Sequence, residues 1–177
     1  MAAVNSTMLP LGTPCPDFQL ADGHGKVHRL ADFADAPALV VAFISNHCPY
    51  VKHLREGLAD FGRDMAALGV AVVAVGSNNV DRYPDDAPDK MVQECKNWGY
   101  VFPYVYDETQ AVAKAFKAAC TPDFYVFDGR GKLAYRGQFD DSRPGNGLPV
   151  TGGDLRNAVH ATVAGRALPF EQLPSIG

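Results

Sequence analysis

The sequence lacks a long apolar run and any excess of positive charge. Its longest apolar stretch, residues 36–44, is far shorter than the roughly 20 residues that cross a bilayer. With 16 Lys and Arg against 20 Asp and Glu, the formal net charge is −4, so no basic excess is present to attract nucleic acid or an anionic membrane. Residues 1–10 have no basic segment followed by an apolar one, as a secretory signal would. We therefore expect a cytoplasmic protein with no nucleic-acid and no membrane partner.

Cysteine is scarce and unpaired. The four cysteines, Cys15, Cys48, Cys95 and Cys120, form no Cys-x-x-Cys pair and no spacing typical of a zinc site. Four are too few for a disulfide-held scaffold, so the default expectation for each is a buried, inert thiol. The sequence also lacks a glycine-rich dinucleotide fingerprint and a P-loop. These absences predict no metal site and no organic cofactor.

The composition is that of a folded chain of ordinary size. Hydrophobic residues make up 47% and charged residues 20%, which excludes disorder for the bulk of the sequence. A length of 177 residues suits one domain, so we predict a single domain over residues 1–177.

Strand-like and helix-like segments alternate along the chain. Residues 38–45 are continuously apolar, as in a central strand covered on both faces, and residues 49–68 carry apolar side chains at helical spacing before Gly69. This alternation predicts an α/β fold with a largely parallel centre. The expected strands are 17–20, 26–29, 38–45, 70–76, 104–106, 124–128 and 132–139, the expected helices are 49–68, 90–98, 108–117 and 154–164, and residues 77–89 are expected to form an exposed loop.

Cys48 lies where a predicted buried strand meets a predicted helix. Pro49 suits the first turn of that helix, because its missing N–H would be unpaired there anyway. The partial positive charge of a helix N-terminus stabilises a thiolate, which is the reactive form of cysteine. The preceding His47 could raise the thiolate population or relay a proton, or be a solvated polar residue. The position favours a reactive Cys48 over a small buried hydrophobe.

A second informative segment joins Cys120 to a predicted strand through Thr121 and Pro122. Proline is confined to the starts and edges of strands. The Thr121–Pro122 bond could be cis, since that form costs only about 0.5–1 kcal/mol before proline, or it could be an ordinary trans bond closing a loop.

Together these segments resemble the thioredoxin-fold superfamily, within its alkyl hydroperoxide reductase/thiol-specific antioxidant branch. The resemblance is closest to the peroxiredoxin-like subgroup. It implies a thioredoxin-like fold with a central mixed β-sheet flanked by helices and an N-terminal β-hairpin extension. The residues that carry it are Gly12–Phe18, Phe43–Val51, Thr121–Pro122, Tyr135–Gly137, Asp140–Ser142 and Asp154–Arg156.

Three departures from the family pattern limit what the resemblance implies. Val51 stands where thioredoxins have their second cysteine and peroxiredoxins their peroxidatic one. Pro122 falls near the arginine of peroxiredoxins, and Ala42 falls where many thioredoxins carry a buried acid. These differences argue against a typical peroxidase and leave Cys48 without the usual partner thiol.

The resemblance assigns Cys48 to the attacking cysteine, with Asn46, His47 and Pro49 as supporting residues of its turn. It implies a thiol-based redox protein, a thiol–disulfide oxidoreductase or antioxidant. Its partners would be thiol or disulfide proteins, or a small thiol or peroxide, with a thioredoxin-type reductant. The alternative is a noncatalytic thioredoxin-fold module that binds an extended peptide and carries a regulatory or vestigial cysteine.

Cys120 is the candidate resolving thiol, which would displace the substrate from Cys48. In this fold the cis-proline loop lies against the active-site turn, and Cys120 precedes Pro122 by two residues, next to Thr121. The hypothesis is a Cys48–Cys120 disulfide with both Thr121 and Pro122 supporting the site. A Cys120 packed behind the loop is the other interpretation, and a cysteine in the C-terminal tail that this subgroup often has would be a rival.

Overall fold

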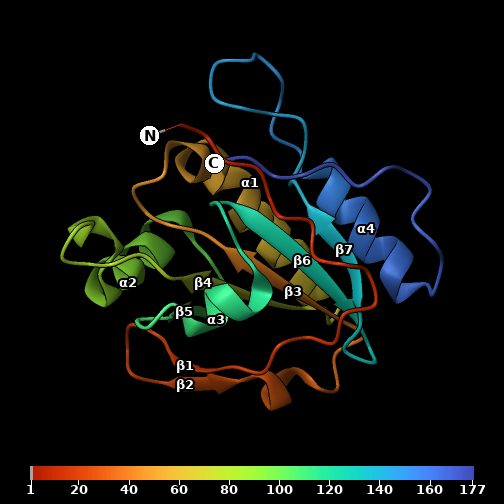
Figure 1. Ribbon diagram of the computed structural model, residues 1–177, viewed down its shortest axis with the longest axis horizontal. Coiled ribbons are helices and arrows are strands. Elements are labelled where there is room, and N and C mark those ends of the chain that lie inside the picture. The colour runs from red at the N-terminus through yellow and green to blue at the C-terminus, as the bar shows by residue number, and fades with distance from the viewer. Residues whose placement is uncertain (1) are drawn as a thin grey trace.

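A computed structural model describes residues 2–177 and has a five-stranded mixed sheet at its centre (Figure 1). The strand order is β5 (Tyr104–Tyr106), β4 (Ala71–Gly76), β3 (Ala38–Phe43), β6 (Asp123–Asp128), β7 (Leu133–Gly137). Only β3, β4 and β5 run parallel, whereas β6 is antiparallel to both β3 and β7. The predicted central mixed sheet is confirmed. The largely parallel centre expected from the alternation of strands and helices holds for β3, β4 and β5, whereas β6 and β7 form a hairpin, which requires antiparallel strands.

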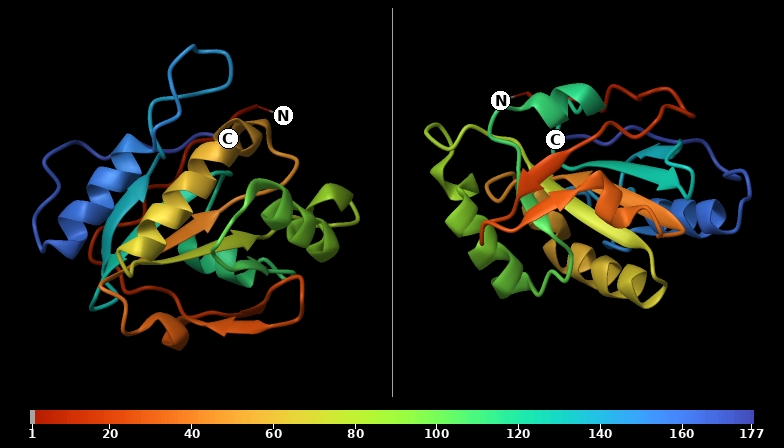
Figure 2. Two further views of the ribbon diagram at one scale, coloured as in Figure 1. Left: turned by 180° about the vertical axis from the view of Figure 1, so that it is seen from behind. Right: turned by 90° about the horizontal axis from the view of Figure 1, so that it is seen from below.

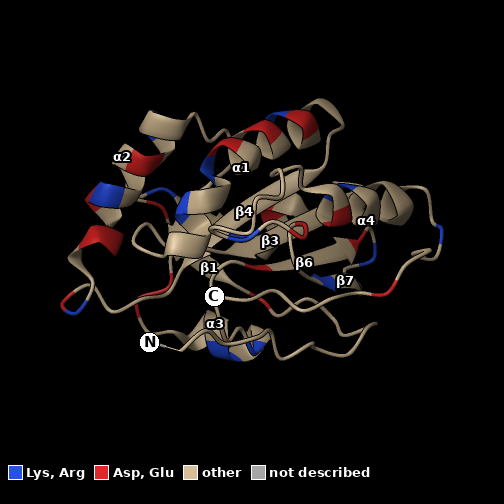
Figure 3. Ribbon diagram, turned by 90° about the horizontal axis from the view of Figure 1, so that it is seen from above, with Lys and Arg blue, Asp and Glu red and all other residues tan. Residues whose placement is uncertain are grey.

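Helices cover both faces of this sheet. Figure 3 shows α1 (Pro49–Ala67), α2 (Pro88–Trp98) and α4 (Gly153–Val163) on one side and α3 (Ala111–Phe116) on the other. Strand β3 is buried along its whole length, and successive side chains point to opposite faces. Accordingly Val40 packs in the core beneath α1, while Val41 packs in the core beneath α3.

A separate two-stranded antiparallel sheet precedes the main one, as predicted. Strands β1 (Gln19–Ala21) and β2 (Val27–Arg29) lie beside the β5 edge, and the 3-10 helix η1 (Leu30–Phe33) follows them (Figure 2). The Asp22 carboxylate closes the turn by accepting hydrogen bonds from the N–H groups of His24 and Lys26.

Helix α1 forms from the pattern seen in the sequence. Pro49 is its first residue, and the side chains at helical spacing, from Val51 to Met65, are buried. The chain leaves the helix through Gly69 at a positive φ of 71°. Helix α3 is shorter than the predicted 108–117, because Gln110 is left-handed and the Asp107 carboxylate binds the first N–H groups of the helix instead.

The two terminal segments of the described chain lie side by side (Figure 1). The N–H of Val4 donates to the carbonyl of Gly177 at 2.8 Å, and the N–H of Gly177 donates back to Val4 at 3.1 Å. The N–H of Ser6 donates in turn to the carbonyl of Ser175. Within residues 2–177, no helix has both the length and the apolar character to cross a membrane.

Candidate active site

Cys48 is the residue that caps the N-terminus of α1. Its backbone is extended, and its N–H donates to Ser45 Oγ at 3.2 Å while its carbonyl accepts the first helical hydrogen bond from Lys52. The residue is buried, with 7% of its surface exposed. The Cys48 thiol donates to the carbonyl oxygen of Thr121 at 3.1 Å. The helix N-terminus thus presents this thiol to the loop that precedes β6.

The register of the sheet explains why residues so far apart in the sequence meet. Phe43, the last residue of β3, pairs with Asp123, the first residue of β6. The chain after Phe43 and the chain before Asp123 therefore leave the sheet at the same edge. The Thr121–Pro122 peptide bond in the second of these segments is cis.

A cavity of about 610 Å³ opens at this edge. Five of the predicted site residues line it: His47, Cys48, Pro49, Cys120 and Thr121. The volume lies in the range of pockets that take small-molecule ligands.

The other two predicted residues, Asn46 and Pro122, support the cavity without lining it. Asn46 is buried, donates through Nδ2 to the carbonyl of Asp85 at 2.8 Å and accepts at Oδ1 from the Tyr104 hydroxyl at 3.1 Å. The carbonyl of Pro122 accepts a hydrogen bond from Ser175 Oγ at 2.5 Å. Asn46 therefore fixes the chain just before Cys48, and Pro122 ties the loop that faces Cys48 to Ser175.

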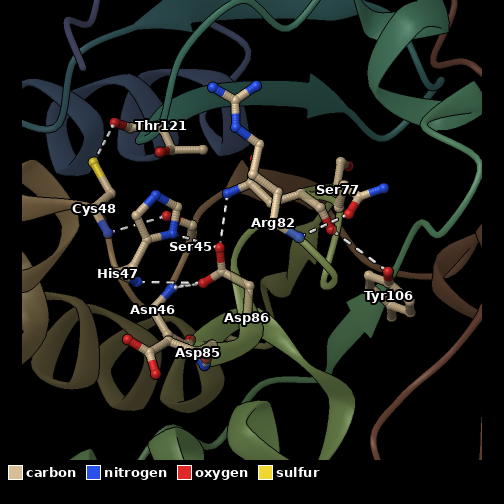
Figure 4. Close-up of polar contacts among 12 residues, drawn as sticks. Ser45, Asn46, His47, Cys48, Ser77, Arg82, Asp85, Asp86, Tyr106 and Thr121 are labelled. Atoms are coloured by element: carbon tan, nitrogen blue, oxygen red, sulfur yellow. Dashed lines mark hydrogen bonds and ion pairs between the residues drawn. The ribbon is translucent and has the colours of Figure 1, made fainter. Parts of the chain in front are cut away.

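Asp86 is the site residue that the sequence did not reveal. It lies in the 3-10 helix η2 (Pro84–Asp86), within the segment predicted to be an exposed loop, yet it is 3% exposed. Its Oδ2 lies 2.5 Å from His47 Nδ1 and accepts from Asn78 Nδ2 at 2.9 Å (Figure 4). Its Oδ1 accepts the N–H groups of Asn46 at 2.6 Å and His47 at 3.3 Å. The prediction of an exposed loop is wrong here, because three N–H groups donate to this carboxylate and the His47 ring lies against it, where water would otherwise be.

Cys120 faces the same cavity in a different environment. Burial, followed by the negative charge of Asp123, raises the pKa of the Cys120 thiol to about 12. Its Sγ donates to the carbonyl of Pro122 at 3.6 Å. Burial also raises the pKa of Asp123, to about 6, against the opposing effect of hydrogen bonds from Ser6 and Tyr125.

The remaining cysteines, Cys15 and Cys95, lie outside the cavity. Burial raises the pKa of Cys15 to about 12 and that of Cys95 to about 11. All four cysteines are free thiols. Among residues 2–177, no three His, Cys, Asp or Glu side chains cluster as a metal site would need.

Comparison with known proteins identifies the family. Residues 11–136 match the family model described as the AhpC/TSA family. The chain belongs to the AhpC/TSA family.

Relatives of this AhpC/TSA protein place it among thioredoxin folds. It is 25% identical over 134 residues to the thiol-disulfide oxidoreductase ResA of Geobacillus thermodenitrificans, covering 72% of this chain and 68% of ResA. A solved conserved protein from Geobacillus kaustophilus is 51% identical, with a TM-score of 0.97 over all of this chain and 94% of that one. The thioredoxin domain of a Bacteroides vulgatus thiol-disulfide oxidoreductase is 16% identical, with a TM-score of 0.63 over 75% of this chain and 91% of that domain. The predicted thioredoxin-like fold and family are confirmed.

The arrangement around Cys48 supplies what thiol chemistry needs. A thiol stands at a helix N-terminus on the wall of a cavity, the imidazole of the residue before it lines the same cavity, and a second thiol faces the same space. This AhpC/TSA site therefore has the groups for exchange between a thiol and a disulfide.

Proposed function

We propose that this protein is a thiol–disulfide oxidoreductase in which Cys48 is the nucleophile. The observation that carries the proposal is the position of Cys48 Sγ, which lies at the N-terminus of α1 and lines the cavity. The Cys48 thiolate attacks one sulfur of a disulfide, a new S–S bond forms as the old one breaks, and the other sulfur leaves as a thiolate. Membership of the AhpC/TSA family and similarity to a thiol-disulfide oxidoreductase support this chemistry.

We further propose that Cys120 resolves the mixed disulfide on Cys48. The two thiols line one cavity, and the raised pKa of Cys120 keeps it protonated at neutral pH, so it does not compete for the first attack. A base is then needed for the second step. Ser6 contacts the Cys120 thiol and donates from Oγ to Asp123 Oδ1 at 2.8 Å, so a proton can pass through Ser6 to Asp123.

The proposed partners are thiol or disulfide proteins, or a small thiol or peroxide, with a thioredoxin-type protein as reductant and a cytoplasmic setting. The noncatalytic peptide-binding alternative has less support. It needs an open groove beside Thr121, but Gly177 packs so closely there that a Cβ on it would lie 1.8 Å from the Thr121 carbonyl oxygen. The Thr121 carbonyl also already accepts the Cys48 thiol.

One experiment tests the nucleophile and the resolving thiol together. The reduced protein receives one equivalent of hydrogen peroxide, free thiols are blocked, and disulfides are mapped by non-reducing mass spectrometry. Peroxide oxidises Cys48 to a sulfenic acid with release of water, and Cys120 displaces a second water to form the disulfide. We expect a Cys48–Cys120 bridge that thioredoxin reduces.

The Cys48→Ser and Cys120→Ser variants should lose that bridge, whereas Cys95→Ser should retain it. A Cys48 that stays reduced and unreactive would overturn the proposed function and favour the binding module. A Cys48 that is oxidised without ever bonding to Cys120 would overturn only the assignment of the resolving thiol.

A further inference from the structure

His47 and Asp86 form a carboxylate–imidazole pair directly before Cys48. His47 Nδ1 lies 2.5 Å from Asp86 Oδ2, and the His47 ring stacks on Tyr83 with centroids 4.3 Å apart and planes inclined by 5°. The side chain of Asp86 is 3% exposed and that of His47 is 28% exposed. The carboxylate is thus buried behind the ring, while the ring itself reaches the cavity.

The hydrogen bonds of Asp86 fix which ring nitrogen carries a proton. Three of its partners, the N–H groups of Asn46 and His47 and the Nδ2 of Asn78, can only donate. A carboxylate that accepts all three offers a remaining lone pair to Nδ1, so Nδ1 carries the hydrogen. In Figure 4 the second ring nitrogen, Nε2, points away from Asp86 toward the side where Cys48 and Thr121 lie.

We infer that His47 is the acid–base catalyst of the Cys48 site and that Asp86 is its positioning residue. This inference rests on the proposed function. Cys48 passes its thiol proton to His47 Nε2 and attacks a disulfide sulfur. As the Sγ–S bond forms and the old S–S bond breaks, the departing sulfur takes that proton from Nε2 and leaves as a thiol. One disulfide replaces another, so the step needs no further oxidant or reductant.

The contribution of a proton donor depends on the leaving group, and this provides the test. A dialkyl disulfide releases a basic thiolate that benefits from a proton, whereas 4,4′-dithiodipyridine releases a stabilised aromatic anion that leaves readily without one. The quantity measured is the ratio of the two rates of mixed-disulfide formation at Cys48, with bis(2-hydroxyethyl) disulfide as the dialkyl probe. The reduced full-length protein is quenched in acid at set times, and the Cys48 peptide is quantified by mass spectrometry.

We expect His47→Gln to lower the dialkyl-to-aromatic ratio by about 100-fold, at the low end of what general acid–base catalysis supplies. His160→Gln, a change at an exposed histidine of α4, should leave the ratio at its wild-type value. A merely structural role of His47 would slow both probes equally and leave the ratio unchanged, which overturns the inference. A Cys48 that reacts with neither probe in the wild-type protein overturns the proposed function instead.

Asp86→Asn tests the positioning role with the same assay and a second measurement. We expect a fall of about tenfold in the ratio and, in ¹⁵N NMR of His47, loss of the single Nδ1–H tautomer that we infer for the wild-type protein. The matched control is Asp85→Asn, the same change at an adjacent exposed carboxylate. If Asp86→Asn keeps both the ratio and the tautomer while His47→Gln changes the ratio, the role of Asp86 is overturned and that of His47 stands.

Discussion

The two sides of the cavity each pair a cysteine with a buried aspartate, but the surroundings differ. Asp86 accepts N–H groups from Asn46, His47 and Asn78, whereas Asp123 accepts hydroxyl groups from Ser6 and Tyr125. Both thiols donate to a carbonyl oxygen, but Cys48 stands at the N-terminus of α1 whereas Cys120 faces the charge of Asp123.

Exposure alone would favour Cys120 over Cys48 as the nucleophile, the reverse of the proposed assignment. Cys48 is the buried one and Cys120 is only partly buried. What separates them is the helix N-terminus at Cys48, which favours a thiolate, and the charge of Asp123 beside Cys120, which favours the protonated thiol. A cysteine is therefore assigned a role from the groups that face it.

The largest effect should come from removing the Cys48 thiol. In Cys48→Ser, Cys120 is the remaining cavity thiol, and its raised pKa leaves almost no thiolate at neutral pH. We expect exchange with a dialkyl disulfide to slow on the order of 10³-fold or more. The rate is measured by release of the thiol product, with Cys95→Ser as the control. Wild-type rates in Cys48→Ser would show that Cys120 can attack unaided and would remove the contrast.

The next effect concerns the pH dependence of stability that Asp123 imposes. Its folded-state pKa of about 6 exceeds the ordinary 3.8, so the folded chain binds more protons than the unfolded chain between these values. Protonated Asp123 therefore contributes to the free energy of unfolding below pH 4. This contribution, about 3 kcal/mol, is lost as the pH rises through 6.

The Asp123→Asn variant should lack this pH-dependent loss of stability, because an amide does not ionise. We expect the free energy of unfolding of the variant, relative to the parent, to increase by up to about 3 kcal/mol between pH 4 and pH 7. Urea denaturation at both pH values measures it, and Asp81→Asn, at an exposed position, should show no such increase. If the variant and the parent differ in free energy of unfolding by the same amount at both pH values, the pKa of Asp123 is not raised in the folded protein.

A smaller effect of the same variant should appear at Cys120. Since the Asp123 charge raises the pKa of Cys120, its removal lowers that pKa and increases the thiolate fraction at fixed pH. We expect alkylation of Cys120 by iodoacetamide at pH 8 to become about tenfold faster, corresponding to about one pKa unit. Site-resolved mass spectrometry measures the rate, with Cys15 as an internal reference. Equal rates in parent and variant would assign the raised pKa to burial alone.

Local patterns were enough to predict most of the framework. The helical spacing from Val51 to Met65 and the proline at position 49 predict α1 nearly to its last residue, because both signals act within one segment. Cys48 at the strand-to-helix junction follows from the same reasoning. Helix α3 was predicted too long because the capping groups come from Asp107, whose side chain competes with the helical backbone.

Asp86 could not be predicted from its own neighbourhood. Two prolines and several acidic residues surround it, which is the composition of a solvated loop. The donors that bury it come from Asn46, His47 and Asn78, so its role exists only once β3 and β4 lie side by side. The surroundings of Cys120 are equally non-local, since Ser6 and Asp123 are separated by 117 positions.

The pairing of the two terminal segments makes one side of the cavity depend on very distant contacts. Ser6 and Ser175, which bind each other, are 169 positions apart, whereas α1 is built from contacts within one segment. Such long-range contacts must first offset the entropy of closing a long loop. A partly folded chain that has formed α1 but not this pairing would therefore present Cys48 without the groups that surround Cys120.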